Sequence, residues 1–202
     1  MDTQVDKIFY LIILIISIVI HEIAHGYAAL YYGDTTARDM GRLTLNPIKH
    51  IDPIGSIVVP LLLFITGSPY MVGWAKPVPY NPNNLNNEKK GTLAVALAGI
   101  AANLSIVLVF TLIIKLAGHY FSIHTLQIMA LVVLVNLILA LFNLLPVPPL
   151  DGSKIVASFG SRKLRDMVEY PRGITMIGFF LVAIILWNIL SPFVLQIYNW
   201  LV

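Results

Sequence analysis

The 202-residue chain is 58% hydrophobic and only 11% charged, with a formal net charge of +3. A typical soluble domain has about 25% charged residues. A soluble core of this size could not hide so much apolar surface, so lipid must be the solvent for most of the chain. Cysteine is absent, which excludes disulfides and thiolate metal ligands. We predict an all-α polytopic membrane protein with four to five membrane helices, forming a single domain over residues 1–202.

Four apolar stretches are long enough to cross a bilayer, which takes about 20 residues. They cover residues 8–31, 92–118, 125–146 and 173–190. An apolar tail follows at 192–202, which either continues the last span or forms a separate interfacial helix. Ile54–Thr66 has only 13 residues and contains Pro60, and prolines at 69, 77, 79 and 82 follow it. Because proline opposes helix and favours extended backbone, we predict a re-entrant hairpin with an extended segment over residues 54–80.

The first span contains three titratable side chains within five residues: His21, Glu22 and His25. An ionisable side chain near the bilayer centre costs roughly 2.5–3.5 kcal/mol by insertion scales, so three of them require compensation. Histidines four residues apart lie on the same helix face and can share a zinc ion, while the glutamate between them can act as a general base. An H-E-x-x-H motif inside an apolar span therefore predicts a zinc site within the membrane.

Asp151, after the 125–146 span, is another ionisable residue at the end of a membrane segment. If it meets His21 and His25, the two helices must approach the same membrane face with their C-terminal ends. That side then receives eleven basic residues: Arg38, Arg42, Lys49, Lys76, Lys89, Lys90, Lys154, Arg162, Lys163, Arg165 and Arg172. The other side receives only Lys7 and Lys115. The positive-inside rule makes the first side cytoplasmic, so the basic excess indicates topology and not a nucleic-acid surface.

Two motifs together carry a family resemblance. HEIAHG (21–26) in one span and N-x-x-P-x-P-P-L-D-G (Asn143–Gly152) after a later one closely resemble the site-2 proteases, which are intramembrane zinc metalloproteases. The segments GRLTLNPIKHIDPIGS (41–56), GWAKPVPYNP (73–82) and LAGIAAN (97–103) resemble the compact prokaryotic branch without an appended regulatory domain. One departure is visible, because the usual G-P-x-x-N motif has isoleucine at position 100 in place of proline.

The resemblance implies a metalloprotease of a prokaryotic cell membrane that cleaves membrane-spanning substrate helices. It implies one zinc per chain with His21, His25 and Asp151 as ligands, Glu22 as the catalytic base and Asn143 near the substrate carbonyl. The expected partners are the lipid bilayer and a membrane-protein substrate, with no nucleic acid. We also predict that Ser68–Pro82 sits beside the zinc site and holds the substrate as an extended strand.

Several of these residues allow other interpretations. Asp151 could cap a helix that begins at Gly152, because aspartate is a favoured N-cap residue. Asn103 and Asn136 are better explained as interhelical hydrogen-bond partners than as site residues. His50 is predicted to be a surface or interface residue.

Two other function classes also fit a membrane His/Glu/Asp cluster. Such clusters mark ion pathways, so a divalent metal-ion transporter is an alternative, although the chain has no evident inverted repeat. A catalytically inactive relative that binds membrane helices is the other alternative. Such a protein usually loses the glutamate or a ligand, and all of these residues are present here.

Overall fold

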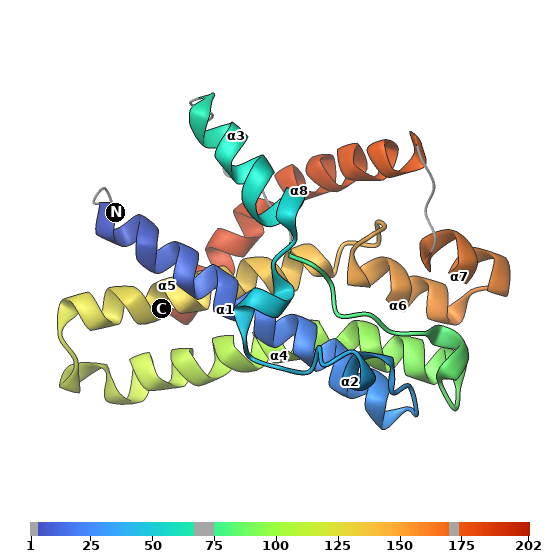
Figure 1. The fold of residues 1–202 in the computed structure, drawn as a ribbon. Helices are drawn as coiled ribbons and strands as arrows, with labels where there is room; N and C mark the ends of the chain where they lie inside the picture. Colours follow the sequence, from blue (N-terminus) through green and yellow to red (C-terminus); the bar gives the residue numbers. More distant parts are fainter. Residues whose placement is uncertain (1–3, 67–74, 170–173) are drawn as a thin grey trace.

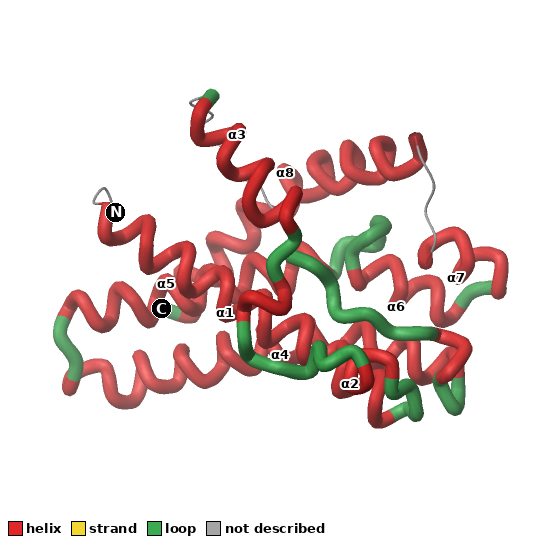
Figure 2. Tube along the Cα trace, viewed as in Figure 1, coloured by secondary structure: helices red, strands yellow, loops and turns green. Residues whose placement is uncertain are grey.

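The computed structural model describes residues 4–66, 75–169 and 174–202, and the regular structure of these ranges is entirely helical (Figure 1, Figure 2). The described α-helices are α1 (Gln4–Tyr31), α2 (Thr36–Asp39), α3 (Val59–Ile65), α4 (Glu88–Ala117), α5 (Ile123–Asn143), α6 (Asp151–Phe159), α7 (Arg162–Glu169) and α8 (Ile174–Leu201). Four segments are long and apolar enough to span a membrane: Phe9–Tyr31, Glu88–Tyr120, Ile123–Asn143 and Leu181–Leu201. The predicted all-α membrane class is confirmed, with four candidate spans.

The ends of the two central helices follow from local sequence. The Asn87 side chain accepts a hydrogen bond from the Lys90 amide at 3.0 Å and caps the start of α4. The Ser122 hydroxyl accepts one from the Thr125 amide at 3.2 Å and caps α5. We expected the second of these spans to reach residue 146, but α5 ends at Asn143. Pro146 disfavours the helical conformation in the residue before it, which explains the earlier end.

The span predicted at 173–190 and the apolar tail at 192–202 could form one helix or two, and the structure joins them. A single helix, α8, runs through Pro192 to Leu201. Proline removes one backbone hydrogen bond from a helix. Membrane helices tolerate this loss, because in lipid the backbone groups on both sides of the proline can form hydrogen bonds only within the helix. The tail therefore belongs to the fourth candidate span.

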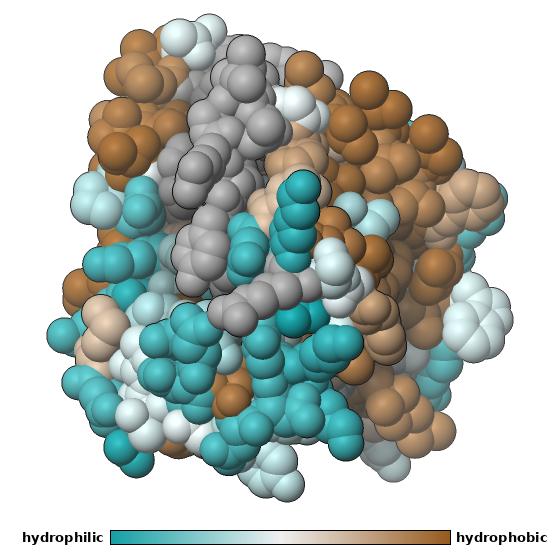
Figure 3. Space-filling view, turned by 90° about the vertical axis from the view of Figure 1, so that its right-hand side faces the viewer, coloured by the Kyte–Doolittle hydropathy of each residue, from teal (hydrophilic) through white to brown (hydrophobic). Residues whose placement is uncertain are grey.

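The helices α1, α4 and α5 run beside one another and form the body of the molecule (Figure 1). The start of α1, the α4–α5 connection and the C-terminus lie at one end, while α2, the start of α4 and α7 lie at the other. Hydrophilic side chains gather at this second end and apolar ones flank them (Figure 3). The arrangement brings the C-terminal end of α1 and the start of α6 to the same end of the bundle.

Buried contacts tie the long helices together. Val107 of α4, Val133 and Leu137 of α5 and Val194 of α8 form one apolar cluster. Asn136 of α5 donates a 2.9 Å hydrogen bond to the Ser17 hydroxyl of α1, which confirms its predicted interhelical role. Asn103 is fully buried, but neither of its amide atoms has a partner among the described residues, so no hydrogen bond of this kind is found there.

The region predicted to be re-entrant begins with helix, and its described later part is extended. A π-helical turn at Pro53–Val58 leads into α3, and residues 75–81 return without helix (Figure 2). Residues 68–74 of the predicted extended segment lie outside the described residues. Arg42 donates to the carbonyls of Lys76 and Pro77 at 3.0 and 3.1 Å, and this fixes the start of the return.

His50 also belongs to this packing, so of the two predicted positions, surface or interface, the structure shows the interface. The side chain is 2% exposed, and its Nε2 lies 2.9 Å from the Thr44 carbonyl oxygen. Its own carbonyl accepts a 2.9 Å hydrogen bond from the Lys76 amide. His50 therefore helps to hold the loop after α2 against the returning segment.

Asp34 fixes the other end of the returning segment. It is fully buried and accepts hydrogen bonds from the Thr36 amide and hydroxyl at 3.1 and 2.5 Å, from the Asn81 amide at 2.7 Å and from Asn84 Nδ2 at 3.0 Å. Burial opposes ionisation of this carboxyl, but the hydrogen bonds from Thr36, Asn81 and Asn84 outweigh it and hold the Asp34 pKa below its usual 3.8.

The lowered pKa of Asp34 makes stability dependent on pH. The ionised carboxylate stabilises the fold above the unfolded-state pKa of 3.8, and this contribution is lost as the pH falls through the lower folded-state value. We expect Asp34→Asn to lower the unfolding temperature near neutral pH and to weaken the loss of stability on acidification. Thermal unfolding in detergent between about pH 6 and pH 3 checks this. Equal pH dependence in the variant and the wild type would contradict it.

Candidate metal centre and active site

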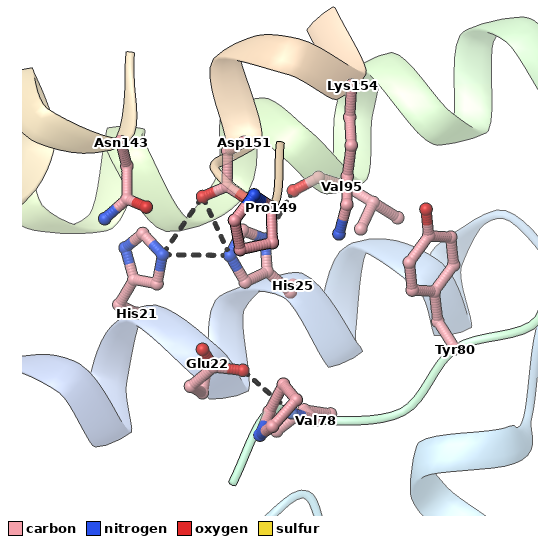
Figure 4. A pocket seen from close by; sticks show the side chains of 11 residues that line it. His21, Glu22, His25, Val78, Tyr80, Val95, Asn143, Pro149, Asp151 and Lys154 are labelled. Atoms are coloured by element: carbon pink, nitrogen blue, oxygen red, sulfur yellow. Dashed lines mark hydrogen bonds and ion pairs between the residues drawn. The ribbon is translucent and has the colours of Figure 1, made fainter. Parts of the chain in front are cut away.

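His21 and His25 lie one turn apart on α1, and both are buried. Their Nε2 atoms are 3.0 Å apart. His25 Nδ1 lies 2.6 Å from the Val95 carbonyl oxygen of α4 (Figure 4). A carbonyl can only accept, so Nδ1 carries the hydrogen and Nε2 of the neutral ring presents its lone pair toward His21. Backbone of the neighbouring helix thus orients one imidazole of the H-E-x-x-H motif.

Asp151, the first residue of α6, brings a carboxylate to the same point. Its Oδ2 lies 3.1 Å from His21 Nε2 and 3.2 Å from His25 Nε2. The helix cap is Leu150, and Asp151 makes no capping bond, so the interpretation of Asp151 as an N-cap is wrong. Gly152 allows this approach, since a Cβ there would collide with the carbonyl oxygens of Leu144 and Leu145.

The three atoms have the chemistry and spacing of a metal site. Asp151 Oδ2 is buried and has no hydrogen-bond partner among the described residues. A tetrahedral zinc with ligands at about 2.0–2.2 Å places them about 3.3–3.6 Å apart, and the observed separations are close to this. Burial opposes ionisation of Asp151, but the His21 imidazole and the positive charge of Lys154 hold its pKa well below its usual range. Two imidazoles and one ionised carboxylate fit a zinc ion.

Glu22 and Asn143 lie on opposite sides of these atoms. Glu22 is half-buried, and its Oε2 accepts a 2.7 Å hydrogen bond from the Val78 amide of the returning segment (Figure 4). Its ligand atom lies within 4.8 Å of those of both histidines. Asn143 ends α5, and its Nδ2 donates to the Leu139 carbonyl at 2.9 Å. The structure therefore brings all five predicted site residues together.

These residues line one pocket with others that sequence reasoning missed. The lining comprises His21, Glu22, His25, Pro77, Val78, Tyr80, Val95, Asn143, Pro149, Asp151 and Lys154. The structure thus places Pro77, Val78 and Tyr80 of the proline-rich segment beside the site, as predicted. Lys154 could have been found from the sequence, because it is three residues after Asp151 and such residues are neighbours on a helix. Val95 and Tyr80 carry no comparable signal.

Gly99 of α4 packs against both imidazoles. A Cβ at this position would lie 2.6 Å from His21 Cε1 and from His25 Cε1 and Nε2, so the rings would have to move. We expect Gly99→Ala to weaken zinc binding about tenfold or more, the scale of losses for residues that orient metal ligands. Competition with a chromogenic chelator measures the affinity. Gly178→Ala is the matched control, since a Cβ there meets nothing within 4 Å. Equal affinities of the two variants would contradict this packing.

Comparison with known proteins decides the family. The sequence pattern of "Peptidase family M50" matches residues 115–185. A Bacillus subtilis protein named "Putative zinc metalloprotease YwhC" is 41% identical over 155 residues, which cover 73% of this chain and 67% of that protein. The chain belongs to peptidase family M50. The resemblance to site-2 proteases, the enzyme class and the zinc cofactor are thereby confirmed, and this M50 chain is a zinc metalloprotease with four candidate membrane spans.

More distant relatives carry the same kind of name. Rip2 of Mycolicibacterium smegmatis is 31% identical over 149 residues, and Rip2 of Mycobacterium tuberculosis is 28% identical over 138 residues. Each alignment covers 68% of this chain but 52% of the Rip2 protein, so the chain spans about half the length of these relatives. No solved structure matches the chain at comparable significance.

Proposed function

We propose that this M50 chain hydrolyses peptide bonds within or near membrane-spanning segments of substrate proteins. In this proposal His21, His25 and Asp151 hold one zinc, Glu22 is the general base and Asn143 contacts the substrate carbonyl. The observation that carries it is the convergence of two Nε2 atoms of α1 and a carboxylate oxygen of α6 within 3.2 Å, beside Glu22. Residues 1–202 would act as a single domain.

The chain supplies a proton acceptor and an oxyanion donor. Zinc, when bound, polarises the scissile carbonyl and makes a water molecule acidic enough to react near neutral pH. The Val78 amide holds Glu22 Oε2, so the carboxylate is positioned to take a proton from water and later return it to the leaving amine. The Asn143 amide has two hydrogens, of which Leu139 uses one. The second is free to stabilise negative charge on the substrate oxygen.

A helical substrate must unwind before attack, because its peptide groups are locked in intrahelical hydrogen bonds. The returning segment 75–81 supports a role in holding the unwound strand. The carbonyls of Lys76 and Pro77 are occupied by Arg42. Those of Val78 and Pro79 have no partner among the described residues and are available to a substrate strand.

The site would lie inside the cytoplasmic half of a prokaryotic cell membrane. With a rise of about 1.5 Å per residue, His21 and His25 lie roughly 15 and 9 Å along α1 from Tyr31. The eleven-to-two division of basic residues supports a cytoplasmic position for the end that carries α2 and α7. The N-terminus would then lie outside the cytoplasm.

Single cysteines test this orientation, since the chain has none. In intact cells we expect a membrane-impermeant thiol reagent to label His119→Cys, in the connection between α4 and α5, and to leave Asn86→Cys unlabelled. Both positions are exposed. Permeabilised cells should allow both to react. Labelling of Asn86→Cys from outside intact cells would reverse the assigned orientation.

Reconstitution tests the proposed activity. The purified protein, placed in lipid vesicles with a single-span substrate, is expected to cleave it, to lose cleavage on zinc chelation and to regain it when zinc returns. Zinc flux without cleavage would favour the transporter alternative. Substrate binding without cleavage by the zinc-loaded protein would favour the inactive relative.

A further inference from the structure

Lys154 enters the pocket but has no part in the proposed mechanism. It lies one turn after Asp151 on α6 and lines the same pocket as Glu22 and the two histidines. Its Nζ lies 5.2 Å from the centre of the Tyr80 ring, on the returning segment (Figure 4). The lysine therefore bridges the space between α6 and the segment proposed to hold the substrate.

The ammonium of this lysine is in direct contact with no carboxylate of the described residues. Among the described residues, no carboxylate oxygen lies within 4.0 Å of its Nζ. The pocket lining contains two carboxylates, Asp151 and Glu22. A bound divalent cation would balance both of these charges and would leave the Lys154 charge uncompensated in a half-buried position.

The aromatic contact orients the ammonium without neutralising it. A cation over a tyrosine ring gains about 0.5–2 kcal/mol, whereas a charge removed from water requires an opposite charge or hydrogen bonds. An anionic group of the substrate would supply both, through a charge-assisted hydrogen bond. Water exclusion by the bound substrate would strengthen that bond.

We propose that Lys154, backed by the face of Tyr80, is a carboxylate-binding subsite that selects substrates with an acidic group close to the scissile bond. The group is either the side chain of an aspartate or glutamate or the terminal carboxylate of a shortened chain. This inference rests on the proposed peptidase function and assigns its substrate class. Lys154 is a specificity-determining residue here and takes no part in proton transfer.

The test is a substrate series cleaved by the reconstituted, zinc-loaded protein. Glutamate, glutamine or lysine is placed in turn at each position near the cleaved bond. We expect the wild type to prefer glutamate to glutamine about tenfold in kcat/KM at one position, the effect of about 1.4 kcal/mol. Lys154→Gln should abolish the preference, and Lys154→Glu should reverse it toward lysine. Lys163→Gln, an exposed lysine of α7, is the matched control and should retain it.

A second arm distinguishes the two carboxylate sources. Shortened substrates with a free terminal carboxylate are compared with the same substrates amidated. If amidation lowers kcat/KM, the bound group is the terminal carboxylate. If replacement of the internal glutamate by glutamine lowers kcat/KM, the bound group is the side chain. If neither change lowers kcat/KM, the proposal is overturned.

A merely structural role for Lys154, such as support of Asp151, gives a different result. Zinc content would fall, or all substrates would lose kcat/KM equally in Lys154→Gln, and either outcome overturns the subsite. Binding of fluorescent glutamate and glutamine peptides to Glu22→Gln separates failure of the subsite from failure of the peptidase function. If Glu22→Gln binds the glutamate peptide more tightly than the glutamine peptide but the wild type cleaves neither, the subsite is retained and the peptidase function is rejected.

Discussion

Glu22→Gln is expected to lower the rate of peptide hydrolysis by about 10²–10⁴-fold, the usual contribution of a general base. Glutamine has the same shape and can still accept the hydrogen bond from the Val78 amide, but it cannot take up a proton at neutral pH. The proposed ligands are untouched, so zinc content should stay at about one per chain. Cleavage kinetics and metal analysis on the same preparation measure both quantities.

Glu88→Gln is a matched control for this loss. Glu88 lies outside the pocket and pairs with Arg165 at 2.9 Å. The control variant should retain both cleavage and zinc. Full activity of Glu22→Gln would remove Glu22 from the role of base, and loss of zinc from that variant would make it a ligand.

Asp151→Ala is expected to weaken zinc binding by at least about a hundredfold, beyond the range found when only a supporting residue is lost. The variant removes a carboxylate that lies 3.1–3.2 Å from both imidazole nitrogens. The two histidines that stay on α1 cannot complete a three-ligand site. Equilibrium zinc binding by chelator competition measures the change, and loss of cleavage should accompany it.

The control for Asp151 is Asp39→Ala at an exposed carboxylate of α2 that pairs with Arg38. It removes the same charge and should keep the wild-type zinc affinity. Full zinc occupancy in Asp151→Ala would exclude the aspartate from the ligand set. The metal would then have to be held by His21, His25 and another donor.

The membrane class and the centre of the site could be predicted because their signals are local. Apolar length identifies a span, and histidines at positions 21 and 25 must share a helix face. Asp151 lies far along the chain, and it is the resemblance of Asn143–Gly152 to the site-2 protease motif that places it beside them. The structure brings their ligand atoms within 3.2 Å.

The remaining features depend on tertiary packing that no local pattern reports. Nothing near Gly99 indicates that two imidazoles press against it. The burial of His50 follows from the returning segment, which contacts it across 26 residues of chain. Continuity of α8 through Pro192 reflects the lack of water in a bilayer, which makes a helix break costly.

The position of the cleaved bond tests the central claim most directly. Mass spectrometry of the products from a reconstituted single-span substrate identifies the bond. We predict a cut inside the membrane segment, in the half nearer the face that carries α2 and α7, at a depth of about 9–15 Å along the helix. Glu22→Gln vesicles should give none of these products. A cut confined to loops outside the membrane, or the same products from Glu22→Gln, would contradict an intramembrane peptidase centred on these residues.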